Sequence, residues 1–218
     1  MKNNHDVAVI EWGVAAQKLA GMNESGDQYF VDSFYPGEHS PPANILVSVV
    51  DGLGHGPKAA VVAKKTVATL EGHAHHPLTF LLERCHKSLR GTRGVVMSLA
   101  SFSANGNMTW LGVGNVEGVL LRGGASPVPK KNERLVLRGG IVGYRLPRLR
   151  PVTLSVDRGD LLVLATDGLR SAFTRVDDKR GSAQQIADRI FEQHHRGTDD
   201  ALVLVARYVG GKGMPPNR

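Results

Sequence analysis

Residues 45–70 read ILVSVVDGLGHGPKAAVVAKKTVATL, which places a strand, an acid, a glycine-rich turn and a helix in direct succession. The apolar, β-branched run before Asp51 is typical of a buried strand. Gly52, Gly54 and Gly56 permit sharp turns and close backbone contacts, and Pro57 suits the first position of a helix. The sequence therefore predicts a carboxylate at the end of a buried strand, followed by a helix over residues 57–70.

Other acids also stand at the ends of predicted strands. Asp27 opens a strand over residues 28–35, Asp167 ends the apolar run DLLVLATDG, and Asp199 or Asp200 precedes a strand over residues 201–209. If neighbouring strands bring these ends together, the carboxylates repel one another unless a cation lies among them. Ligation by oxygen alone favours Mg²⁺ or Mn²⁺ over zinc. A single Asp-Gly pair after a strand is more often only a turn, so this hypothesis depends on the repetition.

The remaining pattern predicts helices and antiparallel strands. A second helix begins after Pro77 and carries Cys85 on its apolar face, and Ser182 suits the N-cap of a third helix. Strands are predicted over residues 7–14, 135–137 and 152–156 and within residues 94–122, where Asn105-Gly106 suits a hairpin turn. Residues 36–44 are predicted to form a surface loop. We assign Trp12 and Trp110 to the core.

The 218 residues, 41% of them hydrophobic, suffice for one sizeable core. We predict a single domain over residues 1–209 and a flexible C-terminal tail over residues 210–218. With Cys85 as the one cysteine, no disulfide forms within the chain, which fits a reducing compartment. No apolar run approaches the length of a signal peptide core or a membrane span. The sequence therefore predicts a cytoplasmic protein with no membrane partner.

The formal net charge of +7 raises nucleic acid as a partner. The Lys and Arg residues are spread along the chain without an aromatic-interleaved RNA-binding motif, so we expect no nucleic-acid partner. They are densest in residues 130–158. A solvated surface is the more common explanation of such a segment; the alternative is a docking surface for an acidic or phosphorylated protein, because arginine pairs well with phosphate.

Four motifs carry a family resemblance: GDQYF at residues 26–30, VVDGLGHGPKAA at 49–60, ATDGL at 165–169 and TDDALVLVARY at 198–208. In this order they resemble the SpoIIE-type branch of the metal-dependent protein phosphatase 2C family, and within it the small RsbX-like feedback phosphatases of the bacterial stressosome. DGLGHGPKAA is the most specific of the four. The resemblance implies an α+β fold, a four-layer αββα sandwich of antiparallel sheets flanked by helices.

The resemblance also implies roles for individual residues. Asp51 would bridge two Mn²⁺ or Mg²⁺ ions, with the carbonyl of Gly52 helping to hold one of them, and Asp27 would act mainly through metal-bound water. Asp167 and Asp199 would complete the site, Asp199 matching the motif better than Asp200. Leu202 stands where the family often has Ser or Thr. His55 lies within the signature, where we expect an exposed turn residue and consider a general acid as the alternative.

The implied activity is hydrolysis of phosphoserine or phosphothreonine in stressosome-type scaffold or switch proteins, which would reset a bacterial stress signal. Two alternatives remain open. A phosphatase fold without turnover could serve as a binding module, although all the predicted acids are present. The other alternative is a phosphatase of small molecules or nucleotides. The chain has no nucleotide-binding loop of the Walker type, because its glycine signature lacks the Gly-Lys-Ser/Thr ending.

Overall fold

The computed structural model describes residues 9–34, 44–123, 130–175 and 178–210, which form two antiparallel sheets and three α-helices. The first sheet has the strand order β1-β10-β9-β6-β7 and the second the order β2-β3-β4-β5-β8. The strands of the first sheet are β1 (Ile10–Gln17), β10 (Ala201–Tyr208), β9 (Leu161–Ala165), β6 (Glu117–Leu121) and β7 (Glu133–Arg134). Those of the second are β2 (Asp27–Phe34), β3 (Asn44–Gly52), β4 (Val95–Ser103), β5 (Asn107–Val113) and β8 (Val152–Ser155).

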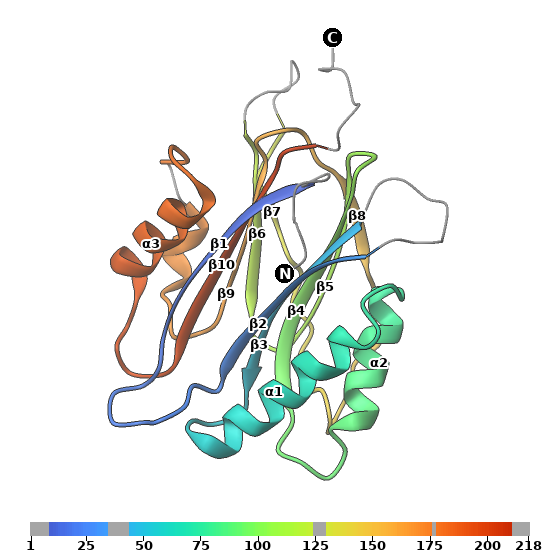
Figure 1. The fold of residues 1–218 in the computed structure, drawn as a ribbon, viewed down its shortest axis with the longest axis vertical. Helices are drawn as coiled ribbons and strands as arrows, with labels where there is room; N and C mark the ends of the chain where they lie inside the picture. The colour runs from blue at the N-terminus through green and yellow to red at the C-terminus, as the bar shows by residue number, and fades with distance from the viewer. Residues whose placement is uncertain (1–8, 35–43, 124–129, 176–177, 211–218) are drawn as a thin grey trace, which may run out of the picture.

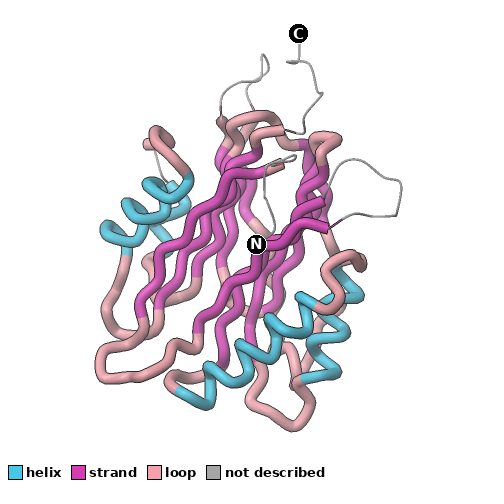
Figure 2. Tube along the Cα trace, viewed as in Figure 1, coloured by secondary structure: helices cyan, strands magenta, loops and turns pink. Residues whose placement is uncertain are grey.

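Helices cover the outer face of each sheet. Helices α1 (Pro57–Glu71) and α2 (Leu78–Ser88) pack on the second sheet, whereas α3 (Ala183–His194) and the short 3₁₀ helix η1 (Ser171–Arg175) pack on the first. Figure 1 shows α3 on one side of the paired sheets and α1 and α2 on the other, and Figure 2 shows the same layers by type of secondary structure. The predicted α+β fold with αββα layers is confirmed.

The central strands bury both of their faces. In β3, Val47 and Val49 lie in the core between the sheets, while Leu46 and Val50 lie in the core under α1 and α2. Side chains alternate between the two faces of a strand, so a strand in the middle of a four-layer sandwich must be apolar throughout. This explains the continuous apolar run before Asp51.

The predicted helix signals are present. Pro57 begins α1 directly after Gly56, whose φ of 73° favours glycine. Ser182 caps α3 in a capping box: its side chain accepts from Gln185 N at 3.2 Å, and its own backbone N donates to Gln185 Oε1 at 2.9 Å. Cys85 is buried and unpaired on the inner face of α2.

Some expectations were wrong in detail. The first strand was predicted over residues 7–14, but β1 lies further toward the C-terminus, at Ile10–Gln17. A strand was also predicted over residues 135–137, but β7 ends at Arg134. There, Leu135 and Leu137 fill the space that Gly112 leaves on β5. Trp110 is buried as predicted, but Trp12 is 44% exposed, because β1 and β2 are edge strands and the Trp12 ring rests against Tyr29 at the open side between the sheets.

Residues 36–43 of the predicted loop lie outside the described residues, and Asn44 already belongs to β3. The predicted tail also lies outside them from residue 211 onward. The single domain over residues 1–209 stays a prediction. Of the helices in the described ranges, none has the length and apolar character needed to cross a membrane.

Candidate metal centre

Two of the predicted acids face each other across β2 and β3. Asp27 is the first residue of β2, Asp51 is the penultimate residue of β3, and the antiparallel register pairs them directly. Alternation places Asp51 on the same face of β3 as Val47 and Val49, which lie between the sheets. Asp27 is buried and Asp51 half-buried. The two carboxylates therefore lie together at the edge of the layer between the sheets.

The other predicted acids arrive at this edge from the first sheet. Asp167 follows the end of β9 and Asp199 precedes the start of β10, and these neighbouring strands run antiparallel. In Figure 1 this is the lower edge, where β3 ends and where the loop before β10 turns. The charges of Asp167 and Asp199 act on the pKa of both Asp27 and Asp51. The fold thus brings the four acids close enough for their charges to interact.

Burial raises the pKa of Asp27 to about 7 and that of Asp51 to about 8, from an ordinary value of 3.8. The surrounding aspartates raise both pKa values further, while a hydrogen bond from Thr166 lowers the pKa of Asp27. Carboxylates that resist ionisation near neutral pH are characteristic of functional sites, because a structural role alone does not require such crowding of negative charge. A bound cation would reverse these shifts.

The hydroxyl of Thr166 supports Asp27, an interaction that the sequence analysis missed. Thr166 Oγ1 donates to Asp27 Oδ2 at 2.7 Å and accepts from Leu202 N at 2.9 Å. Leu202 stands where the family often has a hydroxyl, and the hydroxyl present here comes from Thr166, directly after the neighbouring strand β9, and acts on Asp27. The available signal was the ATDG motif, in which Thr166 directly precedes Asp167.

Asp199 and Asp200 have very different surroundings. Asp200 is 4% exposed, and its two carboxylate oxygens accept from Leu19 N and Gly26 N, both at 2.7 Å. Asp199 is exposed, and among the residues that the structure describes its side chain accepts only from Asp200 N, at 2.8 Å to Oδ1. Asp200 therefore holds the β1–β2 loop, whereas Asp199 keeps oxygen atoms free for a ligand. This difference favours Asp199 as the cation ligand.

Asn115 is a further residue that the sequence analysis missed. It lies in the turn between β5 and β6, and its Nδ2 donates to Asp167 Oδ2 at 2.8 Å. This bond fixes one oxygen of an otherwise exposed carboxylate. No local motif marks Asn115, because only the approach of two distant turns brings it to Asp167.

The glycines of the signature turn meet two different needs. Gly54 has a φ of 79°, a conformation that favours glycine. Gly52 instead lies so close to α1 that an added Cβ would be 2.4 Å from Ala59 O. Glycine at position 52 therefore lets the first turn of α1 pack against the end of β3, directly beside Asp51. His55 lies exposed in this turn.

The donor set fits hard divalent cations. The four aspartates and the backbone carbonyl of Gly52 offer oxygen atoms only, which suits Mg²⁺ or Mn²⁺. Within the ranges that the structure describes, no three His, Cys, Asp or Glu side chains already form a closed metal cluster. The fit therefore rests on donor chemistry and on the burial and mutual repulsion that raise the pKa values of Asp27 and Asp51.

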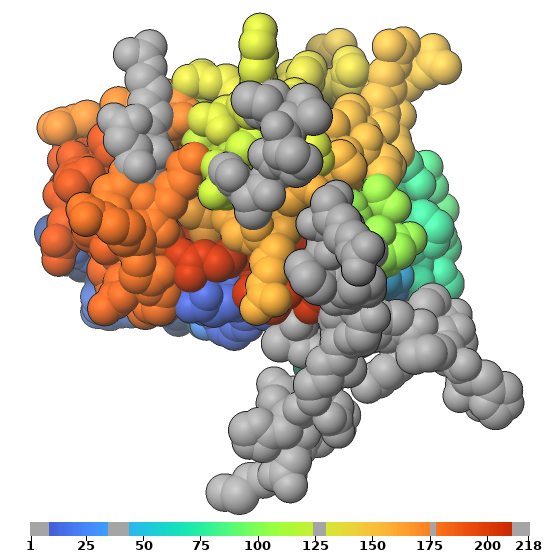
Figure 3. Space-filling view, turned by 90° about the horizontal axis from the view of Figure 1, so that it is seen from above, coloured from blue at the N-terminus to red at the C-terminus, as the bar shows by residue number. Residues whose placement is uncertain are grey.

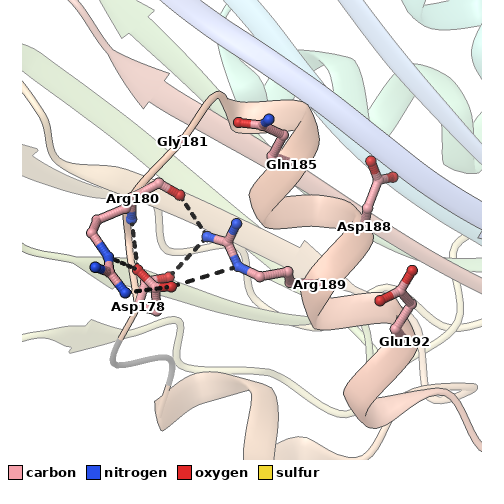
Figure 4. A pocket seen from close by; sticks show the side chains of 7 residues that line it. All are labelled: Asp178, Arg180, Gly181, Gln185, Asp188, Arg189 and Glu192. Carbon is pink, nitrogen blue, oxygen red and sulfur yellow. Dashed lines mark hydrogen bonds and ion pairs between the residues drawn. The ribbon is translucent and has the colours of Figure 1, made fainter.

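A hollow of about 280 Å³ opens beside Asp27, with Lys18, Gln28 and Tyr29 among its walls. Another, of about 530 Å³, lies at the start of α3, where Asp178 pairs with Arg180 and Arg189 (Figure 4). The second hollow is larger, but it contains none of the acids of the candidate centre, and both of its arginines are paired with Asp178. We therefore take the hollow beside Asp27 as the approach to the site.

The chain matches known proteins over most of its length. Residues 41–209 match the family model described as Stage II sporulation protein E (SpoIIE). A curated relative, the phosphoserine phosphatase RsbX of Bacillus subtilis (strain 168), is 25% identical over 185 residues, which span 84% of this chain and 89% of the relative.

Solved structures show the same architecture. A chain from "The bacterial stressosome: a modular system that has been adapted to control secondary messenger signaling" is 29% identical, has a TM-score of 0.79, and is matched over 91% of this chain and 99% of its own length. RsbX in complex with magnesium gives a TM-score of 0.75 at 20% identity, over 95% of this chain and 97% of the other. The catalytic domain of the serine/threonine protein phosphatase PstP with two manganese ions gives 0.63 at 18% identity, over 92% and 99%.

Proposed function

Because the chain belongs to the Stage II sporulation protein E (SpoIIE) family, we propose that it is a metal-dependent phosphatase of phosphoserine and phosphothreonine in proteins. Its fold is that of serine/threonine phosphatases of the protein phosphatase 2C type. The observation that carries the proposal is the directly opposed pair Asp27 and Asp51, whose pKa values are raised by burial and by Asp167 and Asp199.

In this proposal two divalent ions, Mg²⁺ or Mn²⁺, would be held by Asp51 together with Asp27, Asp167, Asp199 and the carbonyl of Gly52. Ions held in this way activate water and neutralise charge on phosphoryl oxygens. The chain's own residues position the ligands: Thr166 orients Asp27, Asn115 orients Asp167, and Asp200 holds the loop that leads into β2. In this proposal the phosphorylated side chain would enter by the hollow beside Asp27, the one acid of the candidate centre among its lining residues.

We assign the substrate to the phosphorylated scaffold or switch proteins of a bacterial stress-signalling complex in the cytoplasm. Two likenesses support this assignment: a relative named a phosphoserine phosphatase, and a solved chain from work on the stressosome at 29% identity. The lone, buried and unpaired Cys85 fits a reducing compartment.

The test compares two Asp→Asn variants on a phosphoserine peptide and on para-nitrophenyl phosphate, with Mn²⁺, with Mg²⁺ and with a chelator. Asp51→Asn should lose activity on the order of 100-fold or more, because it removes a charged ligand from the reacting centre. Asp32→Asn is the matched control, since Asp32 lies exposed on the neighbouring strand β2 and should retain full activity.

Full turnover by Asp51→Asn, or turnover by the wild type in the chelator, would contradict the proposal. Hydrolysis of para-nitrophenyl phosphate without any of the phosphopeptide would instead indicate a small-molecule phosphatase. Binding of the phosphopeptide without phosphate release would indicate a binding module.

A further inference from the structure

Arginines from two distant segments lie beside the candidate metal centre. Arg90 and Arg93 belong to the turn between α2 and β4, and Arg138 and Arg145 belong to the segment between β7 and β8. Arg138 is half-buried and the other three are exposed. None of the four takes part in an ion pair with another described residue. They are therefore available to an external anion.

The two segments are fixed against each other by backbone contacts. Val95 and Val142 exchange both of their backbone hydrogen bonds, at 3.0 and 2.9 Å. Gly143 N donates to His86 Nδ1 at 3.0 Å, and a Cβ at position 143 would lie 2.8 Å from Leu89 Cβ. Gly143, two residues before Arg145, thus lies directly on the C-terminal end of α2, beside the turn that carries Arg90.

Two further contacts connect this surface to the metal centre. Arg93 Nη1 donates to Leu53 O at 2.7 Å, two residues beyond Asp51, and Leu53 N donates to Gly94 O at 3.2 Å. On the other side, Gly114 N donates to Arg138 O at 2.9 Å, directly before Asn115, the partner of Asp167. The arginines therefore border the acids along one side of the site.

We propose that Arg90, Arg93, Arg138 and Arg145 form a docking surface, the arginine rim, for an acidic stretch of the substrate protein next to its phosphoserine. The inference rests on the proposed function and narrows its substrate class. Guanidinium groups bind carboxylates in a bidentate manner, and a positively charged surface favours the approach of an acidic stretch of chain. Tyr144, 78% exposed between these arginines in sequence, adds aromatic surface of the kind enriched at binding interfaces.

The experiment uses two phosphoserine peptides of equal length, one with Asp and Glu flanking the phosphoserine and one with Asn and Gln in their place. The wild-type protein should hydrolyse the acidic peptide with the higher kcat/KM, mainly through a lower KM. The double variant Arg90→Glu/Arg145→Glu should reduce this preference by roughly 3- to 10-fold or more, as expected for exposed ion pairs that become repulsive. Its activity on para-nitrophenyl phosphate should not change, because neither residue contacts the metal centre.

Arg158→Glu is the matched control, with the same charge change in the same basic segment. Arg158 lies between β8 and β9, at the edge opposite to the acids, and Figure 3 looks onto that edge from above. This variant should retain the full preference for the acidic peptide. Equal loss in both variants would overturn the proposal, because it would show an effect of net charge alone.

If the wild type hydrolyses the two peptides equally well, the proposed docking surface is wrong, but the phosphatase proposal is unaffected. If the wild type hydrolyses neither peptide and does not hydrolyse para-nitrophenyl phosphate, both the docking surface and the phosphatase proposal are wrong. A single-stranded oligonucleotide is included as a competitor at physiological salt. If it inhibits the wild type but not Arg90→Glu/Arg145→Glu, the arginine rim binds nucleic acid and the proposal is wrong.

Discussion

At the scale of single residues, acids that repel one another are held in place by a few precise hydrogen bonds. Asp27 and Asp51 are both raised in pKa, to about 7 and about 8. Thr166 and Asn115 each donate to one of the acids, and Asp200 accepts two backbone N–H groups. The folded state therefore maintains a cluster of negative charge that lowers its own stability when no cation is bound.

This cluster predicts how the stability of the chelator-treated protein depends on pH. Because the folded pKa values of Asp27 and Asp51 exceed the unfolded value of 3.8, the folded state binds more protons between about pH 4 and pH 8. The free energy of unfolding should fall as the pH rises from 5.5 to 8, by on the order of 1–3 kcal/mol. Urea unfolding at several pH values measures it.

The same experiment on Asp51→Asn should give a smaller fall, because the amide does not ionise. At pH 8 this variant should be more stable than the wild type in the chelator. A wild-type stability that rises steadily from pH 5.5 to 8 would show that the two carboxylates are not buried together as described.

Thr166 provides a second prediction at this scale. Thr166→Val removes the hydrogen bond to Asp27 and leaves Leu202 N without its partner. Loss of a group that orients a ligand lowers metal affinity by roughly 10- to 100-fold. Titration with Mn²⁺ should show this loss in Thr166→Val, and Thr166→Ser should restore most of the affinity because it keeps the hydroxyl. Equal affinity in all three proteins would exclude this role for Thr166.

At the scale of elements, α3 closes the edge of the first sheet. The Gln184 side chain accepts from Val14 N at 3.0 Å and donates to Val14 O at 2.8 Å, which satisfies backbone groups of the edge strand β1. Gly13 allows this contact, since a Cβ there would lie 2.3 Å from Gln184 Cα. The helix therefore protects an edge that could otherwise pair with another chain.

Gly13→Ala should force α3 away from β1. Overpacking of this kind costs about 1–3 kcal/mol, and here it also breaks the Gln184 hydrogen bonds. Gly72→Ala is the control, because Gly72 has an ordinary φ of −70° and a Cβ there would be no closer than 3.7 Å to any neighbour. Urea unfolding should show a large loss for the first variant and a change within about 0.5 kcal/mol for the second. Similar losses would contradict the close packing of α3 on β1.

At the scale of the whole molecule, the two sheets meet in one apolar layer and end at one acidic edge. Asp27 and Asp51 come from the second sheet, Asp167 and Asp199 from the ends of strands in the first. Cations bound among them would connect the two halves of the sandwich. Binding and global stability should therefore be linked.

Mn²⁺ or Mg²⁺ should raise the Tm of the wild-type protein at pH 8, and a chelator should reverse the effect. A ligand at about 100 times its Kd stabilises the folded state by about 2.7 kcal/mol. Asp51→Asn should lose most of this gain, whereas Asp32→Asn should keep it. A Tm that does not respond to either cation would contradict binding at this edge.

The sequence by itself determined most of the strands and helices and most of the acids, while the αββα layers were implied by the family resemblance of its motifs. Strand and helix follow from the local pattern, and the repeated ending of apolar runs on Asp51 and Asp167 predicted that carboxylates would stand at strand ends. These signals are local, because alternation, capping and glycine turns depend on near neighbours in the chain.

Only the tertiary structure decided which neighbours support those acids. Thr166 reaches Asp27, Asn115 reaches Asp167, and Asp200 rather than Asp199 is buried, through contacts between residues far apart in sequence. The same holds for the arginine rim, whose members come from two segments that Val95 and Val142 join. Hydrogen bonding and electrostatic interaction depend on distance in space, and that distance is fixed by how the sheets pack rather than by any spacing along the chain.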